Sequence, residues 1–166
     1  MFSTQEEITF LETSSFLNKL NKQQLKELVA ICAIETCTTG EVIFKQGDIG
    51  GVMYIVVEGK VLLERELDQR DDTISMNIVK PKTSFGEISL FVDAPRSVTA
   101  SAMEDTKLLS IKNDDFIVFI RQYPDVLIEL NQMLCQRLIE AYDKISEIAQ
   151  PHKPRELRKL YEKLDF

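Results

Sequence analysis

Short segments rich in apolar residues, separated by glycine and aspartate turns, fill the middle of the chain and constrain its fold most. Turn residues such as Gly40 and Gly59 lie between them, and each segment is too short for a typical helix. Regularly spaced strands of this length are typical of an antiparallel barrel or jelly roll. The predicted strands cover residues 41–45, 52–57, 61–67, 73–79, 98–103 and 107–111.

Both ends of the chain have the spacing of helices instead. Residues 8–20 predict short amphipathic helices, and Asn21 has the residue type of an N-cap for a helix over 22–33. After the strands, Asn113 is expected to cap a helix over 114–122, and Tyr123–Pro124 breaks it before a helix over 125–149. A short terminal helix is expected over 155–164. The sequence therefore predicts an α+β fold: an antiparallel β-roll, similar to a jelly roll, flanked by N-terminal helices and a long C-terminal helix.

The long helix carries a heptad seam with one polar position, Asn131. Two interpretations are open: the seam packs on its own domain, or it forms a homodimer in which Asn131 sets the register. The seam consists of Leu127, Asn131, Leu134, Leu138, Ala141, Ile145 and Ile148.

Charge and composition exclude several classes of function. The 166 residues include 27 acidic and 20 basic side chains, a net charge of −7, which is the wrong sign for direct DNA binding. The only histidine, His152, lies near the C-terminus, so a histidine-rich metal centre is excluded. No Ser-His or Cys-His pair for nucleophilic catalysis lies within the domain, so we expect no catalytic residues and no enzyme.

The remaining signals indicate a protein of the cytoplasm. The three cysteines are widely spaced and form no zinc motif, as expected of free thiols in a reducing compartment. The N-terminus lacks the features of a signal peptide, and no apolar run approaches the ~18 residues of a membrane span. We expect no metal and no membrane contact.

The most informative segment is 84–100, SFGEISLFVDAPRSVTA, called the cassette below. Gly86 allows the backbone to approach a ligand, and Arg96 offers a planar charged fork for a phosphate. Ser97 adds a hydroxyl and a backbone N–H, while Pro95 stiffens the returning chain. Glu87 beside an arginine suits a ligand that has both an anion and hydroxyl groups, as a ribose phosphate does. The alternative is a surface turn with a Glu–Arg ion pair.

This segment resembles the phosphate-binding cassette of the cyclic-nucleotide-binding domain family, which includes cyclic-AMP-dependent kinase regulatory subunits and the bacterial catabolite activator. The matching motifs are Phe85-Gly86-Glu87 and Pro95-Arg96-Ser97. Upstream, 44–48 (FKQGD) and 54–59 (YIVVEG) are similar to further family motifs, and 123–127 is similar to the start of the family's lid helix. The resemblance covers roughly residues 13–148 and implies a single domain in four parts. These are an N-terminal helical segment (1–37), the β-roll (38–112), hinge and lid helices (113–149) and a helical tail (150–166).

The resemblance also implies a role for each site residue. Glu87 would accept the ribose 2′-hydroxyl, Arg96 would pair with the cyclic phosphate, and Gly86 and Ser97 would complete the cradle. The purine would lie against apolar positions, for which plain barrel core is the alternative interpretation. The full expected ligand-binding set is Phe85, Gly86, Glu87, Ile88, Pro95, Arg96, Ser97, Leu63, Met76, Val79 and Tyr142.

The lid helix departs from the catabolite activator, whose Thr-Ser pair is replaced here by Ala141 and Tyr142. Tyr142 could stack on a purine or use its hydroxyl. The base is therefore open, with cyclic AMP favoured over cyclic GMP. The segment after Ala149 is shorter than a helix-turn-helix domain.

We therefore expect a sensor that acts through an unknown effector protein or self-association. The alternatives are the regulatory domain of a truncated transcription regulator and a docking or dimerisation module that binds no nucleotide.

Overall fold

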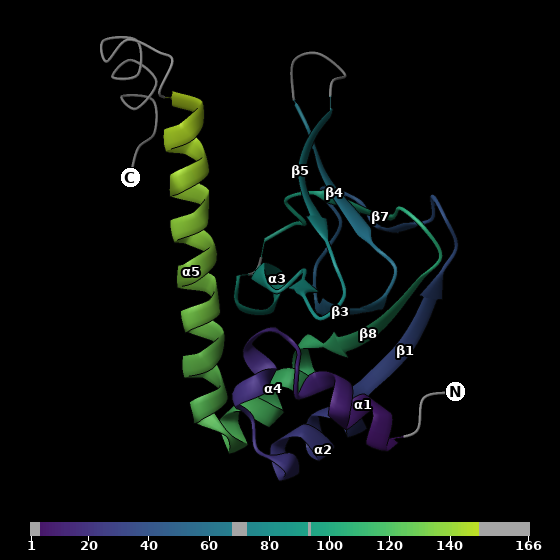
Figure 1. Ribbon diagram of the computed structural model, residues 1–166, viewed down its shortest axis with the longest axis vertical. Helices are drawn as coiled ribbons and strands as arrows, with labels where there is room; N and C mark the ends of the chain where they lie inside the picture. The colour runs from purple at the N-terminus through teal and green to yellow at the C-terminus, as the bar shows by residue number, and fades with distance from the viewer. Residues whose placement is uncertain (1–3, 68–72, 93, 150–166) are drawn as a thin grey trace. The chain divides into compact units, whose positions relative to one another are not determined.

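The computed structural model describes residues 4–67, 73–92 and 94–149 and divides into two compact units, Met1–Leu127 and Ile128–Phe166. The first unit holds the β-roll with the helices that precede and follow it (Figure 1). The second unit holds most of the long helix. The predicted loop 68–72, the predicted terminal helix 155–164 and His152 lie outside the described residues.

The chain begins with α1 (Thr4–Leu11), a 3-10 helix η1 (Ser15–Lys19) and α2 (Lys22–Ile31). The predicted cap of α2 is confirmed. The Asn21 side chain accepts hydrogen bonds from the backbone N–H groups of Gln23 (2.9 Å) and Gln24 (3.0 Å). In return, the Gln24 side chain accepts the Asn21 N–H at 2.8 Å, which completes a capping box.

Two four-stranded antiparallel sheets form the roll, in the orders β1-β8-β3-β6 and β2-β7-β4-β5. All six predicted strands are confirmed, and no end moves by more than one residue. Their bounds are β2 (Val42–Phe44), β3 (Val52–Glu58), β4 (Val61–Glu66), β5 (Thr73–Val79), β7 (Thr99–Ala102) and β8 (Thr106–Lys112). The predicted fold class, an antiparallel roll flanked by helices, is confirmed.

Two strands and two helix boundaries differ from the sequence-based expectation. The helix predicted over 22–33 ends at Ile31, because β1 (Cys32–Cys37) pairs with β8 along its whole length. β6 (Ser84–Phe85) is too short to show an alternating pattern. Asn113 does not cap the next helix: α4 (Asn113–Gln122) begins at Asn113 itself, whose N–H donates to the Gly51 carbonyl at 2.8 Å.

The core of the roll lies between the two sheets and consists of aromatic and aliphatic side chains from both. A second apolar core lies where α1, α2 and α4 gather at one end of the roll (Figure 1). Its fully buried members include Leu11, Leu25, Leu28 and Phe116. The roll core comprises Cys37, Phe44, Tyr54, Val56, Val61, Val79, Phe85, Ala100, Ala102 and Leu108.

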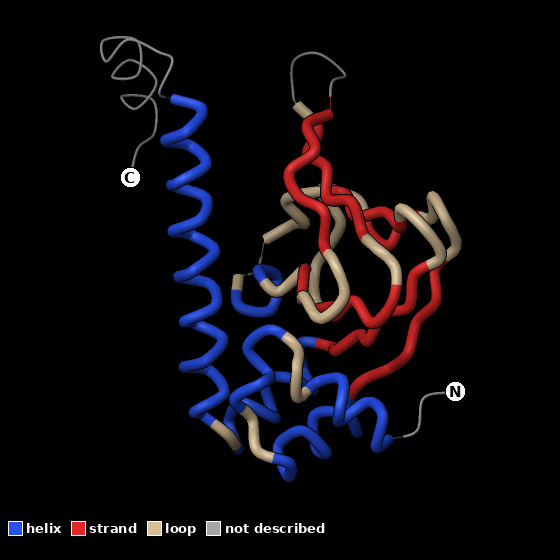
Figure 2. Tube along the Cα trace, in the orientation of Figure 1, coloured by secondary structure: helices blue, strands red, loops and turns tan. Residues whose placement is uncertain are grey.

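β5 is the edge strand of its sheet and pairs only with β4 among the described strands. The hairpin of β4 and β5 projects from the rest of the roll (Figure 2). The sequence of β5, TISMNIV, contains no charged residue, and every position before Val79 is exposed. A β-bulge interrupts the pairing opposite Leu63 and Glu64, at the level of Met76.

The long helix α5 (Pro124–Ala149) starts one residue before the predicted position, with proline at its first position. Leu138 and Ile145, two residues of the predicted heptad seam, are exposed. Within the described part of the chain, no helix combines the length and apolar character needed to cross a membrane.

Candidate functional site

The turn over Gln46-Gly47-Asp48 holds the backbone of Arg96. The Arg96 N–H donates to the Asp48 carbonyl at 2.8 Å, and the Gly47 N–H donates to the Arg96 carbonyl at 2.9 Å. Gly47 has φ +87°, a left-handed conformation that glycine adopts without strain. The two motifs, about fifty residues apart, therefore form one bridge that fixes the end of the cassette.

The guanidinium of Arg96 is buried, with 7% of the residue exposed. Nη1 donates to the Gly86 carbonyl (3.0 Å) and to the Ser89 hydroxyl (2.7 Å), and Nη2 donates to the Val52 carbonyl (2.7 Å). Nε is also buried, and no described residue accepts its hydrogen. Arg96 therefore retains one unsatisfied donor, and a buried donor without a partner costs free energy.

The Arg96 guanidinium packs on a cluster of three aromatic rings, those of Phe44, Tyr54 and Phe85. The carbon of the guanidinium lies 4.1 Å from the ring centroid of Phe44. Phe44 in turn packs on Tyr54 and Phe85, with centroids 6.0 Å apart in both cases, and Tyr54 stacks on Phe85 at 5.2 Å. The aromatic members of the sequence motifs thus have a physical role, because they provide the cation–π face on which Arg96 rests.

Gly86 is required by both conformation and space. Its φ is +76°, and a Cβ at this position would lie 2.8 Å from Arg96 Nη1 and 3.2 Å from the Val52 carbonyl oxygen. No side chain fits there unless the guanidinium moves. The sequence predicts that Gly86 lets a ligand approach the backbone closely. In the structure, the group that approaches the Gly86 backbone is the Arg96 guanidinium.

Glu87 is the second buried charged residue of the cassette, with 6% exposed. It directly precedes the four-residue helix α3 (Ile88–Phe91). Burial lowers the pKa of the Arg96 guanidinium from its usual value, while the charges of Tyr54, Asp48 and Glu87 act in the opposite direction. A buried cation and a buried carboxylate therefore share the cassette.

The structure brings only part of the predicted set together around Arg96. Phe85, Gly86 and Glu87 lie beside it, and Pro95 and Ser97 flank it at the surface. Val79 belongs to the roll core, Leu63 packs against that core, and Ile88 is 55% exposed. Met76 is 51% exposed at the β-bulge. Tyr142 is 50% exposed and belongs to the second unit, so the site described here comes from the first unit alone.

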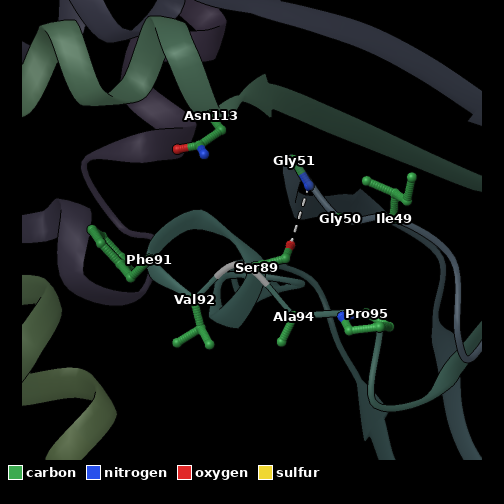
Figure 3. A pocket seen from close by; sticks show the side chains of 9 residues that line it. All are labelled: Ile49, Gly50, Gly51, Ser89, Phe91, Val92, Ala94, Pro95 and Asn113. Atoms are coloured by element: carbon green, nitrogen blue, oxygen red, sulfur yellow. Dashed lines mark hydrogen bonds between the residues drawn. The ribbon is translucent and has the colours of Figure 1, made fainter.

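Ser89 is a site residue that the sequence reasoning missed. Its hydroxyl accepts from Arg96 and donates to the Gly86 carbonyl at 3.0 Å. A small polar residue inside a four-residue helix carries no signal of its own in the sequence. Its position on the turn that faces the Gly50–Gly51 pair becomes visible only when the roll is folded (Figure 3).

A cavity of about 400 Å³ lies on the side of α3 that faces the start of α4 (Figure 3). Apolar side chains, including Ile49, Phe91 and Val92, line most of it, and Asn113 contributes an amide. The buried Oδ1 atom of Asn113 has no hydrogen-bond partner among the described residues.

The donor set of the cassette fits an anionic, hydroxyl-bearing ligand. The unpartnered Nε of Arg96 calls for an acceptor, and a buried carboxylate close by can accept hydroxyl hydrogens. Within residues 4–67, 73–92 and 94–149, no cluster of three or more His, Cys, Asp or Glu side chains could hold a metal ion.

Comparison with known proteins gives consistent matches. The family model of the cyclic nucleotide-binding domain matches residues 34–123, more than half of the chain. The chain is 41% identical over 103 residues to the cyclic AMP receptor protein of Thermus thermophilus, covering 61% of this chain and 47% of that protein. It is 35% identical over 109 residues to a cAMP-dependent protein kinase regulatory subunit of Dictyostelium discoideum, covering 64% and 33%.

The fold agrees with these matches. The crystal structure of the Thermus thermophilus catabolite activator protein superposes with a TM-score of 0.74 at 31% identity, over 82% of this chain and 63% of that chain. The chain spans less than half the length of the two curated relatives. By sequence and by fold, it belongs to the cyclic nucleotide-binding domain family.

Proposed function

We propose that this chain is a regulatory sensor domain that binds a cyclic mononucleotide, with cyclic AMP favoured over cyclic GMP. The observation that carries the proposal is the buried guanidinium of Arg96, whose Nε lacks a partner. A phosphate oxygen satisfies that donor and compensates a charge that burial makes costly. The names of the two relatives above, which refer to cyclic AMP, support this choice of base.

Within the cradle, Arg96 pairs with the cyclic phosphate and Glu87 accepts the ribose 2′-hydroxyl. The N–H groups of Gly86 and Ser97, with the Ser97 hydroxyl, complete the phosphate contacts. The position of Glu87 in the cassette supports its role, because a carboxylate has about four lone-pair sites and can accept from a hydroxyl in addition to a protein donor. Phe85 and Pro95 shape the two ends of the cradle.

The purine lies along the roll on apolar positions, and Tyr142 on the long helix supplies a ring or a hydroxyl to the base. Val79 belongs to the roll core and the half-buried Leu63 packs against that core, which supports a rigid apolar wall. Met76 and Ile88 are exposed, and binding would cover them. A mostly apolar pocket with a few fixed polar groups is the usual form of a small-ligand site.

The output of the sensor is a change in the conformation of α5, transmitted to an effector protein or to a second copy of the chain. A ligand shifts a conformational equilibrium only through contacts that differ between the two states. The seam on α5, with exposed Leu138 and Ile145 and with Asn131 as its polar position, supports self-association as one route.

Calorimetry and thermal unfolding with cyclic AMP, cyclic GMP and linear 5′-AMP test the proposal. A ligand at about a hundred times its dissociation constant stabilises the fold by roughly 2.7 kcal/mol. Arg96→Ala should weaken binding at least about ten-fold, because a charge-assisted bond is lost. Arg65→Ala, which removes an exposed arginine on β4, is the matched control and should bind as the wild type does.

Arg96→Ala also removes bonds to three protein acceptors, so the variant must be shown to be folded before its affinity is interpreted. Stabilisation of the wild type by neither cyclic nucleotide would overturn the proposal. That result would favour the alternative, a roll that serves as a docking or dimerisation module.

A further inference from the structure

The Ser89 hydroxyl is the meeting point of three hydrogen bonds. It accepts from Arg96 Nη1 at 2.7 Å and from the Gly51 N–H at 3.4 Å, and it donates to the Gly86 carbonyl at 3.0 Å. A serine hydroxyl has one hydrogen and two lone pairs, so all its capacity is used. The shortest of the three bonds is the one to the charged guanidinium.

Gly51 continues the chain of contacts beyond Ser89. Its N–H faces the Ser89 hydroxyl, as the dashed line in Figure 3 shows, while its carbonyl accepts the N–H of Asn113 at 2.8 Å. Asn113 is the first residue of α4. The next carbonyl along the chain, that of Val52, accepts from Arg96. An uninterrupted path of hydrogen bonds thus joins the guanidinium to the start of α4.

Ser89 packs tightly against the glycine turn on one side of α3, and a cavity lies on the other side. A Cβ at Gly50 would lie 2.1 Å from the Ser89 Cβ, so the glycine turn and α3 are in direct contact with no room between them. The cavity of about 400 Å³ lies between α3 and the start of α4. A displacement of α3 is therefore passed directly to the turn, and the cavity gives side chains such as Phe91 space to move.

We propose that Ser89 is a positioning residue for Arg96 and that its hydroxyl couples the arginine to the first residue of α4. The inference rests on the proposed function, since the coupling is meant to report a phosphate. Ser89 holds Nη1 while Nε remains for the anion. When the guanidinium moves toward the phosphate, Ser89 and Gly51 follow, and the bond from Asn113 to Gly51 changes.

The test compares Ser89→Ala with Ser110→Ala. Alanine keeps the Cβ that contacts Gly50 and removes only the hydroxyl. Ser110 is the matched control, because it is a buried serine on β8 whose hydroxyl donates to the Ala33 carbonyl at 3.4 Å, away from the cassette. Ser89→Cys, which keeps nearly the same size but accepts hydrogen bonds weakly, serves as a second variant if the alanine variant unfolds.

Three measurements separate positioning from a merely structural role. In the nucleotide-free protein, NMR should show faster hydrogen exchange of the Arg96 Nε–H in Ser89→Ala than in the wild type or Ser110→Ala. With cyclic AMP added, calorimetry should show affinity lowered about ten-fold in Ser89→Ala alone. The change that the nucleotide causes in exchange of the Asn113 amide should also disappear in that variant.

The outcomes distinguish the two proposals. If the wild type binds no cyclic nucleotide, the proposed function fails, and the Arg96 exchange rate in the free protein still decides whether Ser89 positions the guanidinium. If the wild type binds while Ser89→Ala matches it in affinity, in Arg96 exchange and in the response of Asn113, the inference about Ser89 is overturned and the sensor remains.

Discussion

Replacing Gly86 with alanine tests whether the cassette depends on the close contact between this residue and Arg96. An L-residue in the left-handed conformation, here φ +76°, costs about 1–2 kcal/mol. The new Cβ would also lie 2.8 Å from Arg96 Nη1, so the guanidinium must shift. Loss of one charge-assisted hydrogen bond costs a further ~1.5–3 kcal/mol. The total is roughly 2.5–5 kcal/mol of unfolding free energy.

Gly40 offers a matched control for the backbone term. Its φ is +83°, and a Cβ there would meet no atom within 4 Å. Gly40→Ala should therefore lose only the ~1–2 kcal/mol of conformational strain. The difference between the two variants isolates the collision with Arg96.

Urea and thermal unfolding measure that difference directly. For a domain of this size, each kcal/mol corresponds to a shift of about 2–4 °C in Tm. A loss of about 3 kcal/mol in Gly86→Ala would thus lower Tm by roughly 6–12 °C. If both glycine variants lose the same stability, the contact with Arg96 contributes nothing and the reasoning is refuted.

Two further predictions concern parts of the chain outside the cassette. Asn21→Ala should lose about 1 kcal/mol in urea unfolding because it removes the capping box of α2; an equal loss in Asn18→Ala, an exposed residue of η1, would contradict this. Iodoacetamide at pH 8 should label Cys135, which is exposed, much faster than Cys37. Burial raises the pKa of the Cys37 thiol, so less thiolate is present at any pH near neutrality. Mass spectrometry of the native protein measures both rates, and comparable labelling of the two sites would count against the burial of Cys37 at the end of β1.

Most of the roll could be predicted from the sequence because its strands are separated by strong turn residues. Gly40, Gly47 and Gly59 all adopt positive φ angles that few other residues tolerate, so each marks a turn locally. The apolar runs between them then fix the strand bounds to within one residue.

The missed elements depend on partners distant in the chain. β1 follows α2 without a helix-breaking residue, and most of its side chains are exposed, so only its pairing with β8 defines it as a strand. Asn113 is a good capping residue by type, but the Gly51 carbonyl takes its N–H and places it inside α4. Tertiary contacts overrode the local preference in both cases.

The candidate site shows the same division. The chemistry of the glycine, glutamate and arginine of the cassette, with the family resemblance, predicted that they lie together, and the structure places them side by side. Their contacts with a nucleotide stay a prediction. The three protein acceptors that hold the guanidinium could not, since two are backbone carbonyls and the third is Ser89. A backbone carbonyl carries no sequence signature, so no motif reveals that Arg96 also forms hydrogen bonds to the backbone of Gly86 and Val52.

The uncharged edge strand β5 has a consequence for behaviour at high concentration. Unpaired N–H and C=O groups along an edge can add a strand from another molecule, and proteins commonly protect such edges with lysine, proline or a bulge. β5 has neither lysine nor proline, and it exposes Ile74, Met76 and Ile78. Among the described residues, the bulge opposite Leu63 and Glu64 is then the feature of β5 that opposes pairing with a strand of another molecule. Deleting Met76 would remove this irregularity and should therefore make the protein more prone to aggregate through β5.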